Sequence, residues 1–335
     1  MSNLEIRPVE TECEHAPAPS RGGRPVVEVL TAREVPLGGP RAMTVHRTLP
    51  QRQRSLIGAW CFADHYGPDD VSTSGGMDVP PHPHTGLQTV SWLFAGEIEH
   101  RDSGGHHALV RPGEMNLMTG GRGICHSEVS TPGTQTLHGV QLWVALPDAA
   151  RDEPRAFQHH VPPSLRVTGA TVRVLLGTLL GQTSPVHTYT RLLGAEIVLE
   201  PQARLTLAVD PSFEHGVLAD SVGISLEGVG LGRAELGFIG SGLTRLTLAN
   251  GTDARARLLL LGGTPFEEDI LMWWNFVGRS HEEIERFRQE WQDEGERFGR
   301  VEDYQGATQR LAAPELPHVR IRPRQNPPPP VQPTA

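Results

Sequence analysis

Lysine is absent from the chain, so all 30 residues counted as Lys or Arg are arginines. This absence excludes a Schiff-base lysine and a P-loop lysine, and no P-loop pattern of glycines occurs either. The formal net charge is −9. An acidic chain argues against direct binding of nucleic acid, which requires a clustered basic surface to neutralise phosphates.

Cysteine is scarce and long apolar runs are missing. The three cysteines, Cys13, Cys61 and Cys125, are widely spaced, which gives neither a disulfide framework nor the paired spacing of a zinc finger. No segment approaches the roughly 18 consecutive apolar residues of a membrane span. The first ten residues are polar and charged and lack the apolar centre of a signal peptide. We therefore expect a reduced, cytoplasmic protein that does not bind membranes.

Many short strand-like runs are present instead. Apolar or alternating segments recur between turns that contain Gly and Pro, at 89–94, 108–110, 140–146, 172–176, 196–199, 205–209 and 257–261. This spacing is typical of an all-β sandwich or barrel. A polar, proline-containing stretch at 147–163 separates two groups of runs. The sequence therefore predicts two β-barrels in tandem.

The predicted organisation has four parts. They are a mobile tail at 1–25, a metal-binding barrel at 26–150, a second barrel without metal at 151–300, and a flexible Pro-rich tail at 301–335. The second barrel ends in a helix at 281–298, for which Ser280 is the capping residue and Glu283 completes a capping box. Ile284, Phe287 and Trp291 form an apolar stripe at helical spacing.

Two short segments carry metal-capable side chains at positions i and i+2. His82 and His84 form the first pair, and His126 and Glu128 form the second pair after a glycine-rich turn. On a β-strand this spacing directs both side chains of a pair to the same face. Two such pairs facing each other across a small barrel would surround one point with three imidazoles and one carboxylate. We therefore predict a metal site formed by His82, His84, His126 and Glu128.

The predicted ligands suit an octahedral divalent ion with free coordination positions. Fe(II) is the favoured ion, and Mn, Ni, Cu, Co and Zn are the alternatives. The ligand set contains no thiolate, which argues against a structural zinc site. Cys125 precedes His126 and would face the opposite side of the strand, so we interpret it as a residue of the barrel wall.

The sequence around the two pairs resembles the pirin family of the cupin superfamily. The resemblance is carried by HPHTGLQTV (82–90), GEIEHRDS (96–103), PGE (112–114), MTGGRGICHSE (118–128) and HGVQLWV (138–144), with a weaker match from 262–265 through 275–277. It implies two tandem cupin barrels, which are jelly rolls of β-strands, with a short C-terminal helix. It also implies that the N-terminal barrel binds iron through His82, His84, His126 and Glu128.

The resemblance also carries an expectation about function. Some pirins oxidise the flavonol quercetin with O₂, and some act as nuclear cofactors of transcription regulators. The chain is therefore expected to be a metal-dependent dioxygenase of the quercetin 2,3-dioxygenase type, acting on a small enolic aromatic substrate, with Glu128 as the catalytic proton acceptor. The alternatives are a non-enzymatic, redox-sensitive iron protein that acts through a protein partner, and a cupin isomerase or metal-free relic. The family favours a monomer.

One position departs from the family pattern, because pirins usually have Glu where this chain has Gln88. We expect the ligand set to survive and the hydrogen bonding beside the metal to change. His138 is a weaker candidate for a side chain that contacts the metal ligands. Gln141 and Trp143 are expected in the wall of the barrel. The remaining histidines are expected outside the site, with His100, His106 and His107 exposed in a hairpin and His187 and His215 structural.

Overall fold

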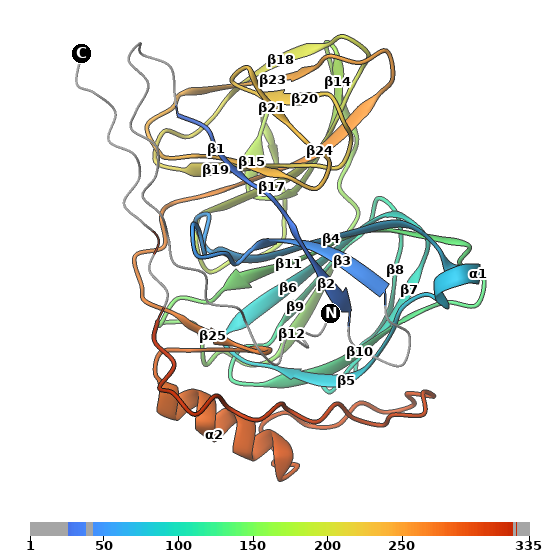
Figure 1. Ribbon diagram of the computed structural model, residues 1–335, viewed down its shortest axis with the longest axis vertical. Helices are drawn as coiled ribbons and strands as arrows, with labels where there is room; N and C mark the ends of the chain where they lie inside the picture. The colour runs from blue at the N-terminus through green and yellow to red at the C-terminus, as the bar shows by residue number, and fades with distance from the viewer. Residues whose placement is uncertain (1–25, 38–42, 324–325, 327–335) are drawn as a thin grey trace.

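The computed structural model describes residues 26–37, 43–323 and 326 (Figure 1). The predicted tail at 1–25 lies outside the described residues. So do residues 324–325 and 327–335 of the predicted Pro-rich tail at 301–335. Within them, 26 strands and two short helices are present, which confirms the all-β prediction. Neither helix is long or apolar enough to cross a membrane.

The first barrel consists of a seven-stranded and a four-stranded antiparallel sheet. The strand orders are β12-β9-β6-β11-β4-β3-β2 and β5-β10-β7-β8. The helix α1 (Val71–Ser74) follows β4. The bounds of the strands are β2 (Arg33–Leu37), β3 (Met43–Leu49), β4 (Trp60–Asp70), β5 (Asp78–His84), β6 (Leu87–Ala95), β7 (Ile98–Asp102), β8 (His107–Val110), β9 (Met115–Thr119), β10 (Ile124–Ser130), β11 (Thr136–Ala145) and β12 (Ala156–His160).

The second barrel repeats this plan. Its sheets have the orders β1-β22-β19-β24-β17-β14-β13 and β18-β23-β20-β21. The bounds are β1 (Glu28–Leu30), β13 (Leu165–Val167), β14 (Ala170–Leu176), β17 (Leu192–Leu199), β18 (Arg204–Ala208), β19 (Glu214–Ala219), β20 (Ile224–Leu226), β21 (Val229–Leu231), β22 (Leu236–Ile239), β23 (Arg245–Asn250) and β24 (Ala256–Gly263). Two hairpins complete the strands, β15 (Thr178–Leu179) with β16 (Gln182–Thr183) and β25 (Leu271–Trp273) with β26 (Phe276–Gly278).

The two ends of the described chain cross between the barrels. Strand β1 precedes the first barrel in sequence but pairs with β22 of the second. The segment after the second barrel returns to the first, where α2 (His281–Gln292) lies beside β5 and β10 (Figure 1). Phe276 of β26 forms a parallel bridge with Thr85, directly after β5. The chain order alone therefore does not assign these elements to a barrel.

Helix α2 begins at the predicted residue and ends earlier than predicted. The Ser280 hydroxyl accepts a hydrogen bond from the Glu283 amide at 3.2 Å, which caps the first turn. The helix ends at Gln292 rather than at residue 298, because Glu294 adopts a left-handed conformation with φ of 54°. The apolar stripe is buried in one cluster with Cys125, Trp273 and Phe276. Helix α2 thus covers the outer side of the strand that carries His126.

The two large sheets pack against each other through one apolar cluster. Val90, Trp92 and Leu142 contribute from the first barrel, and Leu218 and Leu259 contribute from the second. The indole Nε1 of Trp60 lies 3.1 Å from the carbonyl oxygens of both Leu193 and Gly262, so this buried donor is satisfied across the interface. The barrels therefore share a continuous core.

A small polar cluster at the same interface joins the barrels by hydrogen bonds. Asp220 Oδ1 accepts from His65 Nε2 at 2.8 Å and from His138 Nε2 at 2.6 Å. Burial raises the pKa of Asp220, but the hydrogen bonds from His138 and His65 outweigh it and hold the pKa well below its ordinary value. His138 therefore belongs to the barrel interface and not to the surroundings of the predicted ligands.

The polar cluster gives a prediction for stability. Asp220→Ala should lower the free energy of unfolding by about 1–3 kcal/mol near pH 7, because two imidazole donors lose their acceptor. The lowered pKa means that the carboxylate stabilises the fold fully above its ordinary pKa of 3.8, and that this stabilisation is lost as the pH falls through the folded value. Urea unfolding at several pH values measures the difference between the two proteins.

Asp152→Ala, at an exposed position, is the control and should leave stability within about 0.5 kcal/mol of the wild type. A loss in Asp220→Ala no larger than in this control would contradict the assignment. So would a stability difference that persists unchanged as the pH is taken far below 3.8.

Candidate metal centre

The four predicted ligands come from two neighbouring strands of one sheet. His82 and His84 lie on β5, and His126 and Glu128 lie on β10, which pairs antiparallel with it. The register places His126 directly opposite His82. The two pairs therefore stand side by side in one sheet, and the expectation that they face each other across the barrel is wrong. The reason is that β5 and β10 are joined by a ladder of hydrogen bonds.

The proline content of β5 agrees with its position. Pro80, Pro81 and Pro83 cannot donate to a ladder, and β5 is an edge strand whose one neighbour in its sheet is β10. The register with β10 shifts between His126 and Glu128, opposite the two consecutive prolines. An irregular edge strand can thus hold two histidines without a break in the inner strand.

The turn before β10 requires glycine at one position. Gly121 has a φ of 50°, and a Cβ atom there would lie 1.9 Å from the carbonyl oxygen of Glu153. The carbonyl of Gly121 also accepts a hydrogen bond from the Gly86 amide at 2.8 Å. Because Gly86 follows β5, this bond ties the end of one ligand strand to the start of the other.

The three imidazoles converge in the interior of the first barrel. His82, His84 and His126 each offer a nitrogen atom, and these atoms lie within 4.8 Å of one another. The Nε2 atoms of His84 and His126 are 3.0 Å apart. Glu128 forms a second such group with His126 and His100, so the two groups share His126. The structure therefore brings all four predicted side chains to one buried region.

The hydrogen bonds of these imidazoles fit a cation. His82 Nδ1 lies 2.9 Å from the carbonyl oxygen of Pro80, to which it can only donate. Its Nε2 therefore keeps a lone pair, and this buried atom has no partner among the described residues. Burial lowers the pKa of His82 to about 3 and lowers the pKa of His84 and His126 well below the ordinary value. Neutral imidazoles beside a carboxylate are a donor set that a divalent transition metal accepts.

The wall opposite these strands comes from β6 and β11. Ser91 Oγ lies 2.8 Å from Gln141 Oε1 and 3.4 Å from Glu128 Oε1. The ring of Trp143 meets His84 edge-on at a centroid distance of 5.1 Å and stacks on Phe62 at 3.9 Å. The two wall residues predicted on β11 therefore contact the surroundings of the site directly.

Gln88 points away from this region. It lies three positions from Ser91 on a strand with regular pairing, so the two side chains face opposite sides of the sheet. Its amide Nε2 donates to Thr119 Oγ1 at 3.0 Å. The expectation that Gln88 alters hydrogen bonding beside the ligands is therefore wrong.

His100 is a residue that the sequence interpretation misplaced. It was expected to be exposed, yet it is only 3% exposed, and its Nδ1 lies 3.3 Å from His126 Nδ1. Its neighbours His106 and His107 have side chains that are 39% and 52% exposed, and thus follow the expectation. The missed signal was a third i, i+2 pair, His100 with Asp102, on β7.

Cys125 lies in the wall, as expected. Burial raises the pKa of its thiol to about 11, which leaves it protonated near neutral pH. His215, which was interpreted as structural, is buried in the second barrel, and burial lowers its pKa to about 4. Among the described residues, neither belongs to a group of side chains that could hold a metal.

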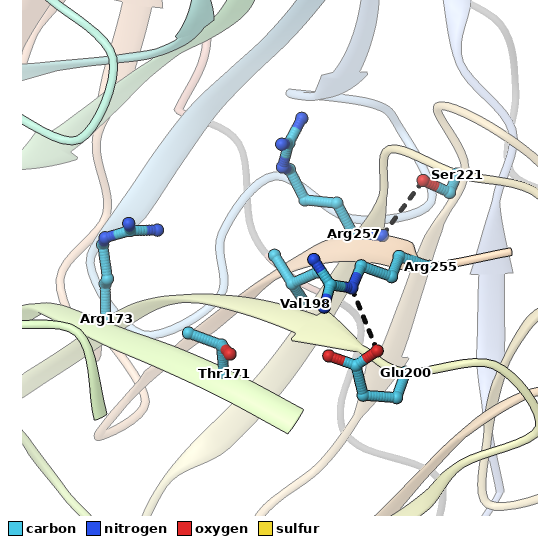
Figure 2. A pocket seen from close by; sticks show the side chains of 7 residues that line it. All are labelled: Thr171, Arg173, Val198, Glu200, Ser221, Arg255 and Arg257. Atoms are coloured by element: carbon cyan, nitrogen blue, oxygen red, sulfur yellow. Dashed lines mark hydrogen bonds and ion pairs between the residues drawn. The ribbon is translucent and has the colours of Figure 1, made fainter. Parts of the chain in front are cut away.

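A groove of about 380 Å³ lies in the second barrel, where Arg173 of β14, Arg257 of β24 and Arg255, which directly precedes β24, gather (Figure 2). Each arginine has a carboxylate partner: Arg173 with Glu196 at 2.8 Å, Arg255 with Glu200 at 2.9 Å, and Arg257 with Glu196 at 3.1 Å. The carboxylates compensate the positive charges, so the groove offers no anion site comparable to the buried cluster of the first barrel.

Comparison with known proteins adds family information. The family model described as Pirin matches residues 42–144, and the one described as Pirin C-terminal cupin domain matches residues 194–299. The chain is 44% identical over 293 residues to a Pseudomonas aeruginosa protein named "Putative quercetin 2,3-dioxygenase", covering 87% of this chain and 91% of that protein. It is 34% identical to a pirin-like protein of Caulobacter vibrioides, covering 78% and 92%.

Solved structures agree on the fold. A crystal structure named as quercetin 2,3-dioxygenase from Acinetobacter baumannii superimposes with a TM-score of 0.84 at 37% identity, covering 89% of this chain and 98% of that one. The Escherichia coli pirin YhhW in complex with nickel(II) has a TM-score of 0.57 at 15% identity, covering 72% and 100%, and shows the fold alone. These matches confirm the expectation of two tandem cupin barrels.

Removal of one imidazole tests the predicted ligand set. After anaerobic reconstitution, the wild-type protein should retain one Fe(II) per chain, and His126→Ala should bind it more than about 100-fold more weakly. The loss of a ligand should lower the metal affinity more than the loss of a group hydrogen-bonded to a ligand, which costs about 10–100-fold. Elemental analysis and metal titration measure both quantities. His107→Ala, on an exposed side chain, should bind like the wild type. Equal retention of iron in His126→Ala would exclude His126 as a ligand.

Proposed function

The chain belongs to the pirin family of cupin proteins, and from this premise we propose that it is a metal-dependent dioxygenase of the quercetin 2,3-dioxygenase type. The observation that carries the proposal is the convergence of His82, His84 and His126 with Glu128 inside the first barrel. The similarity to proteins named as quercetin 2,3-dioxygenases over most of the chain supports the reaction class.

The metal site is the first part of the proposal. His82, His84 and His126 would bind the ion through nitrogen, and Glu128 would bind it through oxygen. Fe(II) is the ion that we favour, with Mn, Ni, Cu, Co and Zn as alternatives for the same nitrogen and oxygen donors. A bound divalent ion supplies Lewis-acid stabilisation to the enolate form of a substrate.

The side chains around the site define what the protein itself contributes. Glu128 is the carboxylate at the site and would accept the proton that an enolic hydroxyl releases on binding. Ser91 donates its one hydroxyl proton to Gln141 Oε1 at 2.8 Å and lies beside this carboxylate, 3.4 Å from Glu128 Oε1. The stacked rings of Phe62 and Trp143 add a buried apolar wall beside His84, of the kind that favours an aromatic over a polar substrate.

The burial of the site suits oxygen chemistry. His82, His84 and His126 are fully buried, and Glu128 is 1% exposed, so bulk water has little access to the reacting groups. The substrates in this proposal are a small flavonol-like molecule and O₂. The cytoplasmic location, the monomeric state, a protein partner and the lack of direct nucleic-acid binding stay predictions from the sequence.

Quercetin oxidation tests the proposed function. The Fe(II)-loaded wild-type protein should consume O₂ and quercetin together, and His126→Ala should fall to the rate without protein, because the substrate enolate would lose its stabilising cation. An oxygen electrode and the absorbance of quercetin follow the two reactants. His107→Ala is the matched control and should retain wild-type rates. Metal-loaded wild-type protein that leaves both reactants unchanged would contradict the proposal.

A further inference from the structure

A second histidine and a carboxylate lie directly behind His126. His100 Nδ1 is 3.3 Å from His126 Nδ1, and His100 Nε2 is 3.1 Å from Asp102 Oδ2. His100 and Asp102 are each only 3% exposed. The pairing of β7 with β10 sets these neighbours, because it places Asp102 opposite His126 and His100 opposite Glu128. The contacts therefore follow from the strand register.

The chemistry of these groups fixes the direction of both hydrogen bonds. An ionised carboxylate can only accept, so His100 Nε2 carries the proton that it shares with Asp102. With its one proton on Nε2, His100 has a bare Nδ1, which can only accept a hydrogen bond from His126 Nδ1. This arrangement leaves His126 Nε2 without a proton. That atom is the one directed at His84 Nε2, 3.0 Å away in the buried cluster.

Asp102 is itself held in one orientation. Its Oδ1 accepts from the backbone amides of Gly104 at 2.7 Å and His106 at 3.1 Å, and the ring Nδ1 of His106 lies 3.1 Å from Oδ1 and 3.2 Å from Oδ2. The ring of Phe157 packs on His100 at a centroid distance of 5.0 Å and stacks on His106 at 5.2 Å. Because Oδ1 is occupied by two amides, only Oδ2 faces His100. Asp102 Oδ2 is thus held in place as the acceptor for His100 Nε2.

We propose that His100 and Asp102 are positioning residues that keep the proton of His126 on Nδ1 and thereby present its Nε2 lone pair to the metal. The inference rests on the proposed metal site and deepens it by assigning two residues outside the ligand set. A ligand imidazole whose second N–H donates to another imidazole, which in turn donates to a carboxylate, has its tautomer fixed and its basicity raised.

Asp102→Asn is the variant that separates positioning from packing. The amide has the same shape, and its oxygen should stay with the Gly104 and His106 amides, which need an acceptor. Its NH₂ group then faces His100 Nε2 and must donate to it. His100 would carry its proton on Nδ1 and donate to His126 Nδ1, which moves the His126 proton to Nε2. The variant therefore reverses the direction of the hydrogen bonds from residue 102 to His100 and from His100 to His126, and it keeps the packing of the side chain.

The experiment measures the tautomer and the metal affinity separately. In metal-free protein labelled with ¹⁵N-histidine, NMR should show His126 protonated on Nδ1 in the wild type and on Nε2 in Asp102→Asn. Titration with Ni(II) should show about 10–100-fold weaker binding in Asp102→Asn. Asp152→Asn, at an exposed position, is the control and should match the wild type in both measurements.

Two results would overturn the inference. One is a wild-type His126 that is protonated on Nε2, which needs no variant to be observed. The other is an Asp102→Asn protein that binds Ni(II) as tightly as the wild type. A wild type that binds no metal would instead contradict the proposed function. The NMR spectrum would still show which nitrogen of His126 carries the proton, and so decide the present inference.

Discussion

The antiparallel pairing of β5 with β10 is the constraint on which the site depends. It places His126 opposite His82 and keeps His84 within 3.0 Å of His126. A slip of one residue would turn the side chains of one strand to the other face and separate the two pairs. The bond between Gly86 and Gly121 ties the ends of the two strands, and α2 covers the outer side of β10. A bond between the two strand ends and a helix from the C-terminal part of the chain therefore support one register.

The side chains that this register brings together are buried, and their burial determines what they can bind. Three imidazoles and a carboxylate without solvent are costly unless each polar atom finds a partner. Backbone and side-chain bonds satisfy one nitrogen of His82 and one of His126, and they leave the Nε2 lone pairs toward one another. A cation satisfies these lone pairs and the carboxylate together. The first barrel thus combines neutral donors, an anionic donor and an apolar aromatic wall in one interior.

Much of this arrangement could be predicted from the sequence, because side chains two apart on a strand share a face. The i, i+2 pairs identified His82, His84, His126 and Glu128, and the family models confirm the resemblance to pirins. The partner of each strand could not be predicted, since spacing within a strand says nothing about its neighbours.

The same limit explains the errors. His100 looked exposed because its hairpin is polar, yet the pairing of β7 with β10 turns it inward. Gln88 looked close to the ligands in sequence, but alternation along β6 directs it to the other face. The return of α2 to the first barrel depends on contacts across the whole chain, which local patterns do not contain.

X-ray absorption at the iron edge tests the central claim most directly, because it reports the donors around the metal itself. The Fe(II)-loaded protein should show only light nitrogen and oxygen neighbours at about 2.0–2.2 Å, in the range of protein imidazole and carboxylate ligands. The multiple scattering should be that of several imidazole rings. A spectrum without imidazole scattering, or with a sulfur neighbour, would contradict a site formed by His82, His84, His126 and Glu128.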